Sequence, residues 1–89
     1  MPAELQERRR NVLAKIRSAV SEVTELDEGF RYRFASDELL PELGTLIHLE
    51  HQCCPFLTFR LTVESGMDSV VLEMTGPDGT KDFLADVFG

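Results

Sequence analysis

The first twenty residues carry apolar side chains at the spacing of an amphipathic helix. Charged and amide side chains separate these apolar positions, which are Leu5, Val12, Leu13, Ile16 and Val20. Residues three and four apart share one face of an α-helix, and proline is tolerated near a helix start. The pattern therefore predicts a helix from Pro2 to about Val20.

A period of two follows, which is typical of β-strands. Arg31 and Arg33 alternate with the aromatic residues Phe30, Tyr32 and Phe34. This alternation predicts a strand with one aromatic face and one arginine face. Residues 21–26 fit a preceding strand, although the first helix could also continue through them. The glycine in the link 27–29 suits a tight hairpin between the two strands.

A second helix is expected from about Ser36 to Cys53. Ser36 and Asp37 are residue types that cap helices, and Pro41 suits an early helical position. Pro55 then ends the helix and favours an extended backbone at the residue before it. Gly44 lies inside the helix, where glycine costs about 1 kcal/mol relative to alanine, so we expect close packing at that position.

The last third of the chain predicts two strands and a short helix. The strand over 56–64 places apolar side chains on one face, namely Leu57, Phe59, Leu61 and Val63. The strand over 69–75 does the same with Val70, Leu72 and Met74. Turn residues at 76–79 precede Thr80, a capping type, and a final helix should dock on the sheet through Phe83, Leu84, Val87 and Phe88. The whole chain, residues 1–89, is expected to be a single α+β domain with the order α-ββ-α-ββ-α. We expect a four-stranded, mainly antiparallel sheet with helices on one face.

Charge narrows the possible partners. The formal net charge is −7, from 9 basic and 16 acidic residues, and such a surface repels nucleic-acid phosphates. The triplet Arg8-Arg9-Arg10 is interpreted as a solvated helix face. The amino end lacks an apolar export segment, and no apolar run approaches the ~20 residues of a membrane helix. We therefore expect a cytoplasmic protein that contacts neither membrane nor nucleic acid.

The segment HLEHQCCPF, residues 48–56, holds both cysteines of the chain. Projected at ~100° per residue, Glu50, Cys53 and Cys54 fall on the leucine-rich face of the second helix. His48 falls on the opposite face and His51 at the border. A carboxylate on an apolar face is normally paired, protonated or part of a site. Free cysteine also packs well as a small core residue, so a purely structural role stays open.

Thiol chemistry at this position favours a bound cation. Thiolate is the reactive and metal-binding form, but the dipole at a helix C-terminus opposes negative charge. A soft metal ion would supply the positive charge that deprotonates both thiols. Adjacent cysteines do not match common structural zinc spacings, and neighbouring side chains are expected to diverge. A homodimer that brings two cysteine pairs together would relieve that difficulty.

Two stretches resemble a small, largely uncharacterised bacterial domain family. Its motifs are Glu-x-x-Cys-Cys-Pro-Phe-Leu-x-Phe and a later Thr-Gly-Pro-x-Gly-Thr-x-x-Phe-Leu. The matching positions are Glu50, Cys53, Cys54, Pro55, Phe56, Leu57 and Phe59, then Thr75, Gly76, Pro77, Gly79, Thr80, Phe83 and Leu84. The resemblance implies a loose association with heavy-metal handling and with regulators of the mercury-responsive type. Neither histidine belongs to the motif.

Three hypotheses follow. The first is a domain that binds a soft metal or metalloid ion, such as zinc or mercury(II), without catalysis. Its ligands would be Cys53 and Cys54, with Glu50 orienting a thiol or accepting its proton and His51 completing the shell. The second is a thiol redox sensor or thiol enzyme, in which one cysteine attacks and the other resolves. The third is a structural or interaction module with core cysteines, whose arginine face or sheet edge is open to a partner or a second copy.

Overall fold

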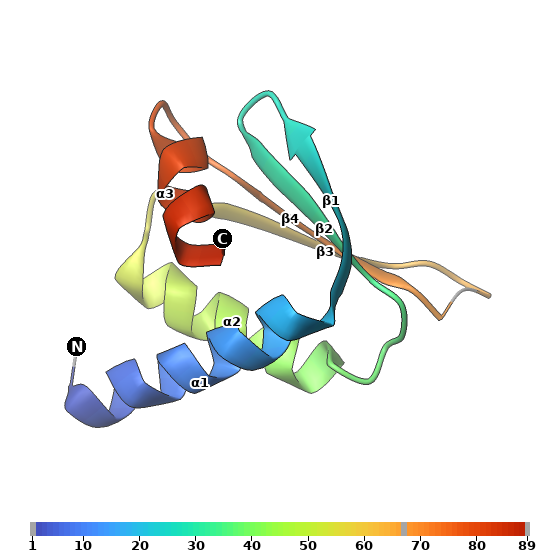
Figure 1. Ribbon diagram of the computed structural model, residues 1–89, viewed down its shortest axis with the longest axis horizontal. Coiled ribbons are helices and arrows are strands. Elements are labelled where there is room, and N and C mark those ends of the chain that lie inside the picture. The colour runs from blue at the N-terminus through green and yellow to red at the C-terminus, as the bar shows by residue number, and fades with distance from the viewer. Residues whose placement is uncertain (1, 67, 89) are drawn as a thin grey trace.

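The computed structural model describes residues 2–66 and 68–88, which form three helices and one four-stranded sheet (Figure 1). In chain order the elements are α1 (Ala3–Ala19), β1 (Val20–Leu26), β2 (Gly29–Phe34), α2 (Leu40–Cys53), β3 (Thr58–Val63), β4 (Val70–Thr75) and α3 (Thr80–Phe88). The predicted α+β class and element order are confirmed. Within the described residues, no helix combines the length and apolarity needed to cross a membrane.

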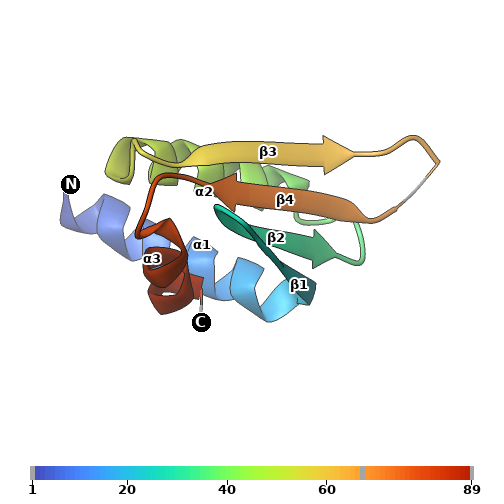
Figure 2. The same ribbon diagram turned by 90° about the horizontal axis from the view of Figure 1, so that it is seen from above.

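The sheet is antiparallel, with the strand order β1-β2-β4-β3. Residues that lie opposite one another on neighbouring strands point to the same face. Tyr32 of β2 lies opposite Val23 of β1 and Leu72 of β4. Seen from above, β3 and β4 pass in front of α2, and α3 lies beside the sheet, next to α1 (Figure 2). Residues of all three helices pack into the core on one face of the sheet. The helices therefore form one layer and the sheet the other.

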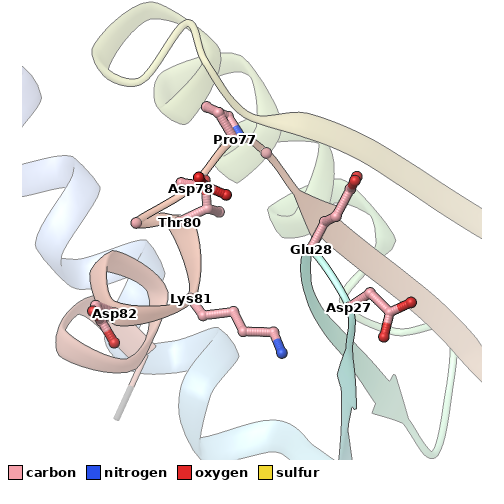
Figure 3. Close-up of a pocket in the computed structure, with 9 residues that line it drawn as sticks. Asp27, Glu28, Pro77, Asp78, Thr80, Lys81 and Asp82 are labelled. Atoms are coloured by element: carbon pink, nitrogen blue, oxygen red, sulfur yellow. The ribbon is translucent and has the colours of Figure 1, made fainter.

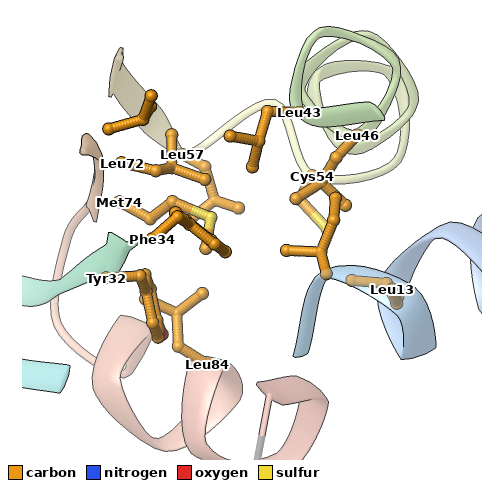
Figure 4. Packing of buried hydrophobic residues seen from close by; sticks show 12 residues of the cluster. Leu13, Tyr32, Phe34, Leu43, Leu46, Cys54, Leu57, Leu72, Met74 and Leu84 are labelled. Atoms are coloured by element: carbon orange, nitrogen blue, oxygen red, sulfur yellow. The ribbon is translucent and has the colours of Figure 1, made fainter. Parts of the chain in front are cut away.

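The hydrophobic core lies between these two layers (Figure 4). The sheet contributes the aromatic face of β2 and the alternate apolar residues of β4, all on the side that faces the helices. Leu13 and Ile16 of α1, Leu43 and Leu46 of α2 and Leu84 of α3 fill the core from the opposite side. The predicted core faces of these elements are confirmed. Phe83 and Val87 pack against the core as expected, whereas the side chain of Phe88 lies outside the described part.

Residues 20–26 form a strand, so the alternative of a longer first helix is wrong. The helix α1 ends at Ala19, and Val20 has an extended backbone. An irregularity between Val20 and Glu22 shifts the register of β1 on β2. Such bulges are common on edge strands. The irregularity lies where the chain passes from the helical layer into the sheet.

The apolar face predicted for β3 is only partly buried. Leu57 precedes the strand and is buried, and Phe59 is partly buried. Leu61 and Val63 are 37% and 53% exposed, although they lie opposite the buried Leu72 and Val70. Because β3 is the last strand of the sheet, its outer side has no neighbouring strand to cover these side chains. Alternation in the sequence correctly predicts which face of the sheet these side chains occupy, but it does not predict that they are exposed.

Two glycine environments differ from the expectation. A Cβ at Gly44 would have no heavy atom within 4 Å, so the expected close packing there is wrong. Gly44 instead lies on the exposed side of α2. Gly29 is the more crowded of these two glycines, because a Cβ there would lie 1.9 Å from the backbone oxygen of Met74. The hairpin glycine therefore allows β2 and β4 to approach closely.

The predicted capping residues do not cap helices. The helix α2 begins at Leu40, later than expected, and its N-terminus has no side-chain cap. Ser36 and Asp37 form the turn before it, where the Ser36 hydroxyl accepts from the N–H of Glu38 at 3.4 Å. The buried Thr80 hydroxyl has no hydrogen-bond partner within the described residues. The residue types therefore predicted roughly where these two helices begin, but not which groups cap them.

Candidate metal centre

The last turn of α2 brings three potential metal ligands together. A carboxylate oxygen of Glu50 and the sulfurs of Cys53 and Cys54 all lie within 4.8 Å of one another. No other group of at least three histidine, cysteine or acidic side chains is this compact in the part of the chain that the structure describes. The structure thus brings together three of the four residues that the sequence proposed as ligands.

The end of the helix explains how adjacent cysteines can face one site. Cys53 is the last residue of α2, and Cys54 leaves the helical conformation with φ −131° and ψ 74°. The N–H of Cys54 still donates to the carbonyl of Glu50, at 2.6 Å. Pro55 favours this extended backbone at the residue before it. The expected divergence of the two side chains is therefore wrong, because the chain changes direction between them.

The two thiols differ strongly in exposure. Cys54 is only 3% exposed and belongs to the core cluster, between α2 and Leu13 of α1 (Figure 4). Cys53 is exposed, so its predicted place on the buried face is wrong. It lies where α2 ends, and it lines a pocket of 190 Å³ with Gln6, Arg9 and Arg10. The site therefore has one thiol in the core and one that solvent reaches.

Glu50 is almost fully buried, with 1% exposure, and is paired with an arginine. The Nε and Nη2 atoms of Arg9 each lie 3.0 Å from Glu50 Oε1. A buried carboxylate needs such a partner, since an uncompensated buried charge is costly. The interpretation of all three arginines 8–10 as a solvated face is therefore wrong for Arg9. Burial alone would lower the pKa of Arg9, but the Glu50 carboxylate and the cysteines outweigh it and raise that pKa.

The sequence held a signal for Arg9. It lies four residues after Leu5 and four before Leu13, so it falls on the apolar stripe of α1. Glu50 occupies an equivalent place among the leucines of α2. Two opposite charges on the apolar faces of two helices predict an ion pair if those helices pack together. The helices α1 and α2 do contact each other, but no pattern in the sequence states that they do.

The Cys54 thiol donates to Glu50 Oε2 at 3.7 Å. Burial raises the pKa of Cys54 to about 12, and the hydrogen bond to Cys53 and the negative charges of Cys53 and Glu50 act in the same direction. The Arg9 charge opposes this rise without overcoming it. Cys54 is therefore a protonated thiol at neutral pH, and it becomes a thiolate only if another cation replaces its proton.

The histidines lie outside the compact ligand group. Both are exposed, and the Nε2 atom of His48 lies 3.2 Å from Nε2 of Gln52. His51 is in the last turn of α2, close in sequence to the cysteines, but among the described residues it does not join their group. The structure therefore shows a three-ligand group without a histidine.

A larger pocket of 420 Å³ lies between the β1–β2 turn and the start of α3 (Figure 3). Four acidic residues line it, which are Asp27, Glu28, Asp78 and Asp82. In Figure 3 Asp27 and Asp82 lie on opposite sides of Lys81. Lys81 itself donates to Glu25 at 2.9 Å. These carboxylates do not converge as the ligands at the end of α2 do, so this pocket is not a second candidate.

Comparison of the chain with protein families, with curated proteins and with solved structures finds no match. The family resemblance of the Cys-Cys-Pro-Phe segment therefore stays a prediction. The candidate site rests on its own geometry.

Proposed function

We propose that this domain binds a soft metal or metalloid ion through the thiolates of Cys53 and Cys54. The observation that carries the proposal is the compact group of both sulfurs and the Glu50 carboxylate. Two metal–sulfur bonds of ~2.3 Å laid end to end span ~4.6 Å. The sulfurs lie no more than 4.8 Å apart, so one ion can bridge them with little movement of the backbone.

The charges at the site suit a divalent ion. Arg9 and Glu50 already neutralise each other. The two negative charges of the thiolates would cancel the two positive charges of a divalent cation. A partly buried site accommodates such a neutral group more readily than a net charge. Ions that accept two or three ligands fit this group best, and mercury(II) is an example. Zinc requires a fourth ligand, for which His51 or a water molecule would have to join the group.

Glu50 has two roles in the proposal. Its Oε1 holds Arg9, and its Oε2 accepts from the Cys54 thiol and thereby orients that sulfur toward the site. When the ion displaces the Cys54 proton, Glu50 Oε2, which accepts the hydrogen bond of that thiol, can pass the proton on to solvent and keep its own charge opposite Arg9. In a reducing compartment such as the cytoplasm both thiols would remain free to bind. The resemblance to a domain associated with heavy-metal handling supports the same function.

The test is a titration of the reduced protein with mercury(II), zinc and arsenite while thiolate-to-metal absorbance is followed. We expect one ion per chain, with affinity that rises with pH because each bound thiol releases a proton. The variants Cys53→Ser and Cys54→Ser should each weaken binding, and the double variant should abolish it. His48→Ala is the matched control and should bind as the natural chain does. If no ion gives a signal that depends on both cysteines, the proposal is wrong.

A second candidate function is a thiol redox sensor, which the pocket beside Cys53 favours. The exposed thiol lines this pocket beside Arg9 and Arg10, so an oxidant in solvent can reach it. The raised pKa of Cys54 opposes the role of a resolving thiol. Iodoacetamide alkylation of Cys53 separates the two functions. A rate that is already maximal at neutral pH supports the redox role, and a rate that still rises through pH ~9 opposes it.

A further inference from the structure

The two edges of the sheet differ in how well they are protected. The strands β1 and β3 lie at opposite ends of the strand order, so each has one side without a neighbouring strand in the described chain (Figure 2). Exposed edges invite pairing with another chain, and natural proteins block them with bulges or repelling charges. The strand β1 has both devices, since it carries a register irregularity and the acidic residues Glu22 and Glu25. A second copy of β1 would therefore meet like charges.

The β3 edge lacks these devices. Its pairing with β4 is regular over Thr58–Val63, without a bulge, and it contains no proline. Five of its six residues are exposed. Leu61 and Val63 are large apolar side chains left partly uncovered on the helix side of the sheet. The strand therefore presents open backbone groups and an incomplete apolar face at the same edge.

The charges along β3 are complementary to themselves. Arg60 lies on the face away from the core, and Glu64 follows the strand on that same face. Arg60 lies opposite Glu73, but the Glu73 carboxylate is already paired with Arg31 at 3.1 Å. No ion pair of Arg60 or Glu64 occurs within the described residues. An antiparallel copy of β3 reverses the order of the two charges, so each Arg60 would approach the Glu64 of the other copy.

We propose that a second copy of this chain pairs with the β3 edge in antiparallel orientation, which gives a homodimer with one continuous sheet. The two-fold axis would pass at Leu61, so that Leu61 lies opposite Leu61 of the second copy. Val63 would then lie opposite Phe59 of the second copy, and the uncovered apolar stripe would continue across the interface. This proposal is independent of metal binding, because it rests on the edge strand and not on the cysteines.

The register places the charges within reach of each other. With Leu61 on the axis, Arg60 lies opposite Thr62 of the second copy and is diagonal to both Glu64 and Arg60 of that copy. Two attractive Arg60–Glu64 contacts therefore oppose one repulsive contact between the two Arg60 side chains. Diagonal neighbours on antiparallel strands are about 7–8 Å apart, which long side chains can bridge. The pair occurs twice because the interface is symmetric. It also favours this antiparallel arrangement over a parallel one, in which like charges would lie side by side.

The first experiment measures the molar mass in solution by light scattering or sedimentation equilibrium. We expect twice the 10.0 kDa of one chain at about 100 µM, where an association with a Kd near 1 µM is essentially complete. Arg60→Glu should give a monomer, because four carboxylates then meet at the interface. The double variant Arg60→Glu, Glu64→Arg restores complementary charges and should restore the dimer. A natural chain that stays monomeric at that concentration overturns the proposal.

A matched control uses the other edge. Val23 of β1 is 54% exposed on the same face of the sheet as Leu61. Val23→Lys should leave the dimer intact, whereas Leu61→Lys should dissociate it. Far-ultraviolet circular dichroism shows whether each variant is folded. If Val23→Lys dissociates a dimer that Leu61→Lys leaves intact, the interface lies at the other edge and the proposal is wrong.

Cross-linking tests the register. In a Cys53→Ser background, Leu61→Cys places two thiols directly opposite each other, at a Cβ separation of about 4.5–5.5 Å. Mild oxidation should then produce a covalent dimer. Val63→Cys is the comparison, because the proposed register separates its two copies by four residues along the strand, about 13 Å. A covalent dimer from Val63→Cys but not from Leu61→Cys would contradict the proposed axis.

Discussion

Replacing Arg9 with methionine tests whether the Arg9–Glu50 ion pair stabilises the fold. The variant retains most of the apolar stem of Arg9 and leaves the carboxylate of Glu50, which is 1% exposed, without its partner. Removing one member of a buried pair costs about 3–5 kcal/mol. The Arg9 side chain is 21% exposed, so water enters its place and we expect about 2–4 kcal/mol. That loss is large for a domain of this size, whose total stability is about 4–13 kcal/mol.

The assay is equilibrium unfolding in urea at pH 7, followed by far-ultraviolet circular dichroism because the chain has no tryptophan. The melting temperature should fall as well, by about 4–8 °C for each kcal/mol lost. The double variant Arg9→Met, Glu50→Leu removes both charges and should recover most of the loss. Comparison with the two single variants gives the coupling free energy of the pair.

The matched control is Lys81→Met. It removes an ion pair with Glu25, whose side chain is 71% exposed, at the sheet edge. Exposed pairs contribute about 0–1 kcal/mol, so this variant should remain close to the natural chain. The reasoning is refuted if Arg9→Met loses no more stability than Lys81→Met. It is equally refuted if the double variant is as unstable as independent single losses predict.

Three further predictions concern stability. Burial raises the pKa of Cys54 from 9.0 to about 12, so the unfolded chain loses that proton first as pH rises. The contribution of Cys54 to the free energy of unfolding should then be constant below pH ~9 and fall by roughly 1.4 kcal/mol per pH unit between pH ~9 and the folded-state pKa. Burial also raises the pKa of Tyr32 from 10.0 to about 12, so Tyr32 adds a second decline in the free energy of unfolding, which Tyr32→Phe should remove. Urea unfolding between pH 8 and 11 measures both declines, and a flat profile contradicts them. Gly44→Ala should stabilise the chain by about 0.5–1 kcal/mol, since its Cβ meets nothing within 4 Å. Gly29→Ala should destabilise it by several times as much, because its Cβ would clash with the backbone of Met74. Thermal melts of the two variants show whether the effects have opposite signs. Thr80→Val replaces a buried hydroxyl that lacks a partner in the described residues and should raise stability by about 1 kcal/mol, whereas a loss in urea unfolding would mean that this hydroxyl does cap α3.

The element order was predictable because each segment carries its own periodicity. The helical spacing of α1 and the alternation in β2 and β4 reflect faces that pack against the core, although Phe30 and Val12 are only partly buried. Local turn residues between these segments then fix the number of elements. What the sequence does not state is the order of strands across the sheet. For that reason the exposure of Leu61 and Val63 at the edge could not be predicted from their alternation.

The candidate site was predictable only in part, and for a related reason. The helical projection placed Glu50 and Cys54 correctly, because both lie within or next to the regular part of α2. It failed for Cys53, which is the last residue of α2 but is exposed, because a projection gives the direction of a side chain and not whether another element covers it. Arg9 was missed because it comes from α1, 41 residues away in the chain. Contacts between elements decide the partner of a buried charge, and periodicity describes only one element at a time.

The unequal exposure of two neighbouring thiols gives this chain a built-in reporter of its own folding. A folded molecule offers one readily accessible sulfur and conceals the other, whereas an unfolded molecule offers both. Counting the sulfurs that a bulky reagent labels quickly would therefore give the folded fraction without any added dye or tag. The same count could be taken in a crude extract, where optical signals from a chain lacking tryptophan are hard to isolate.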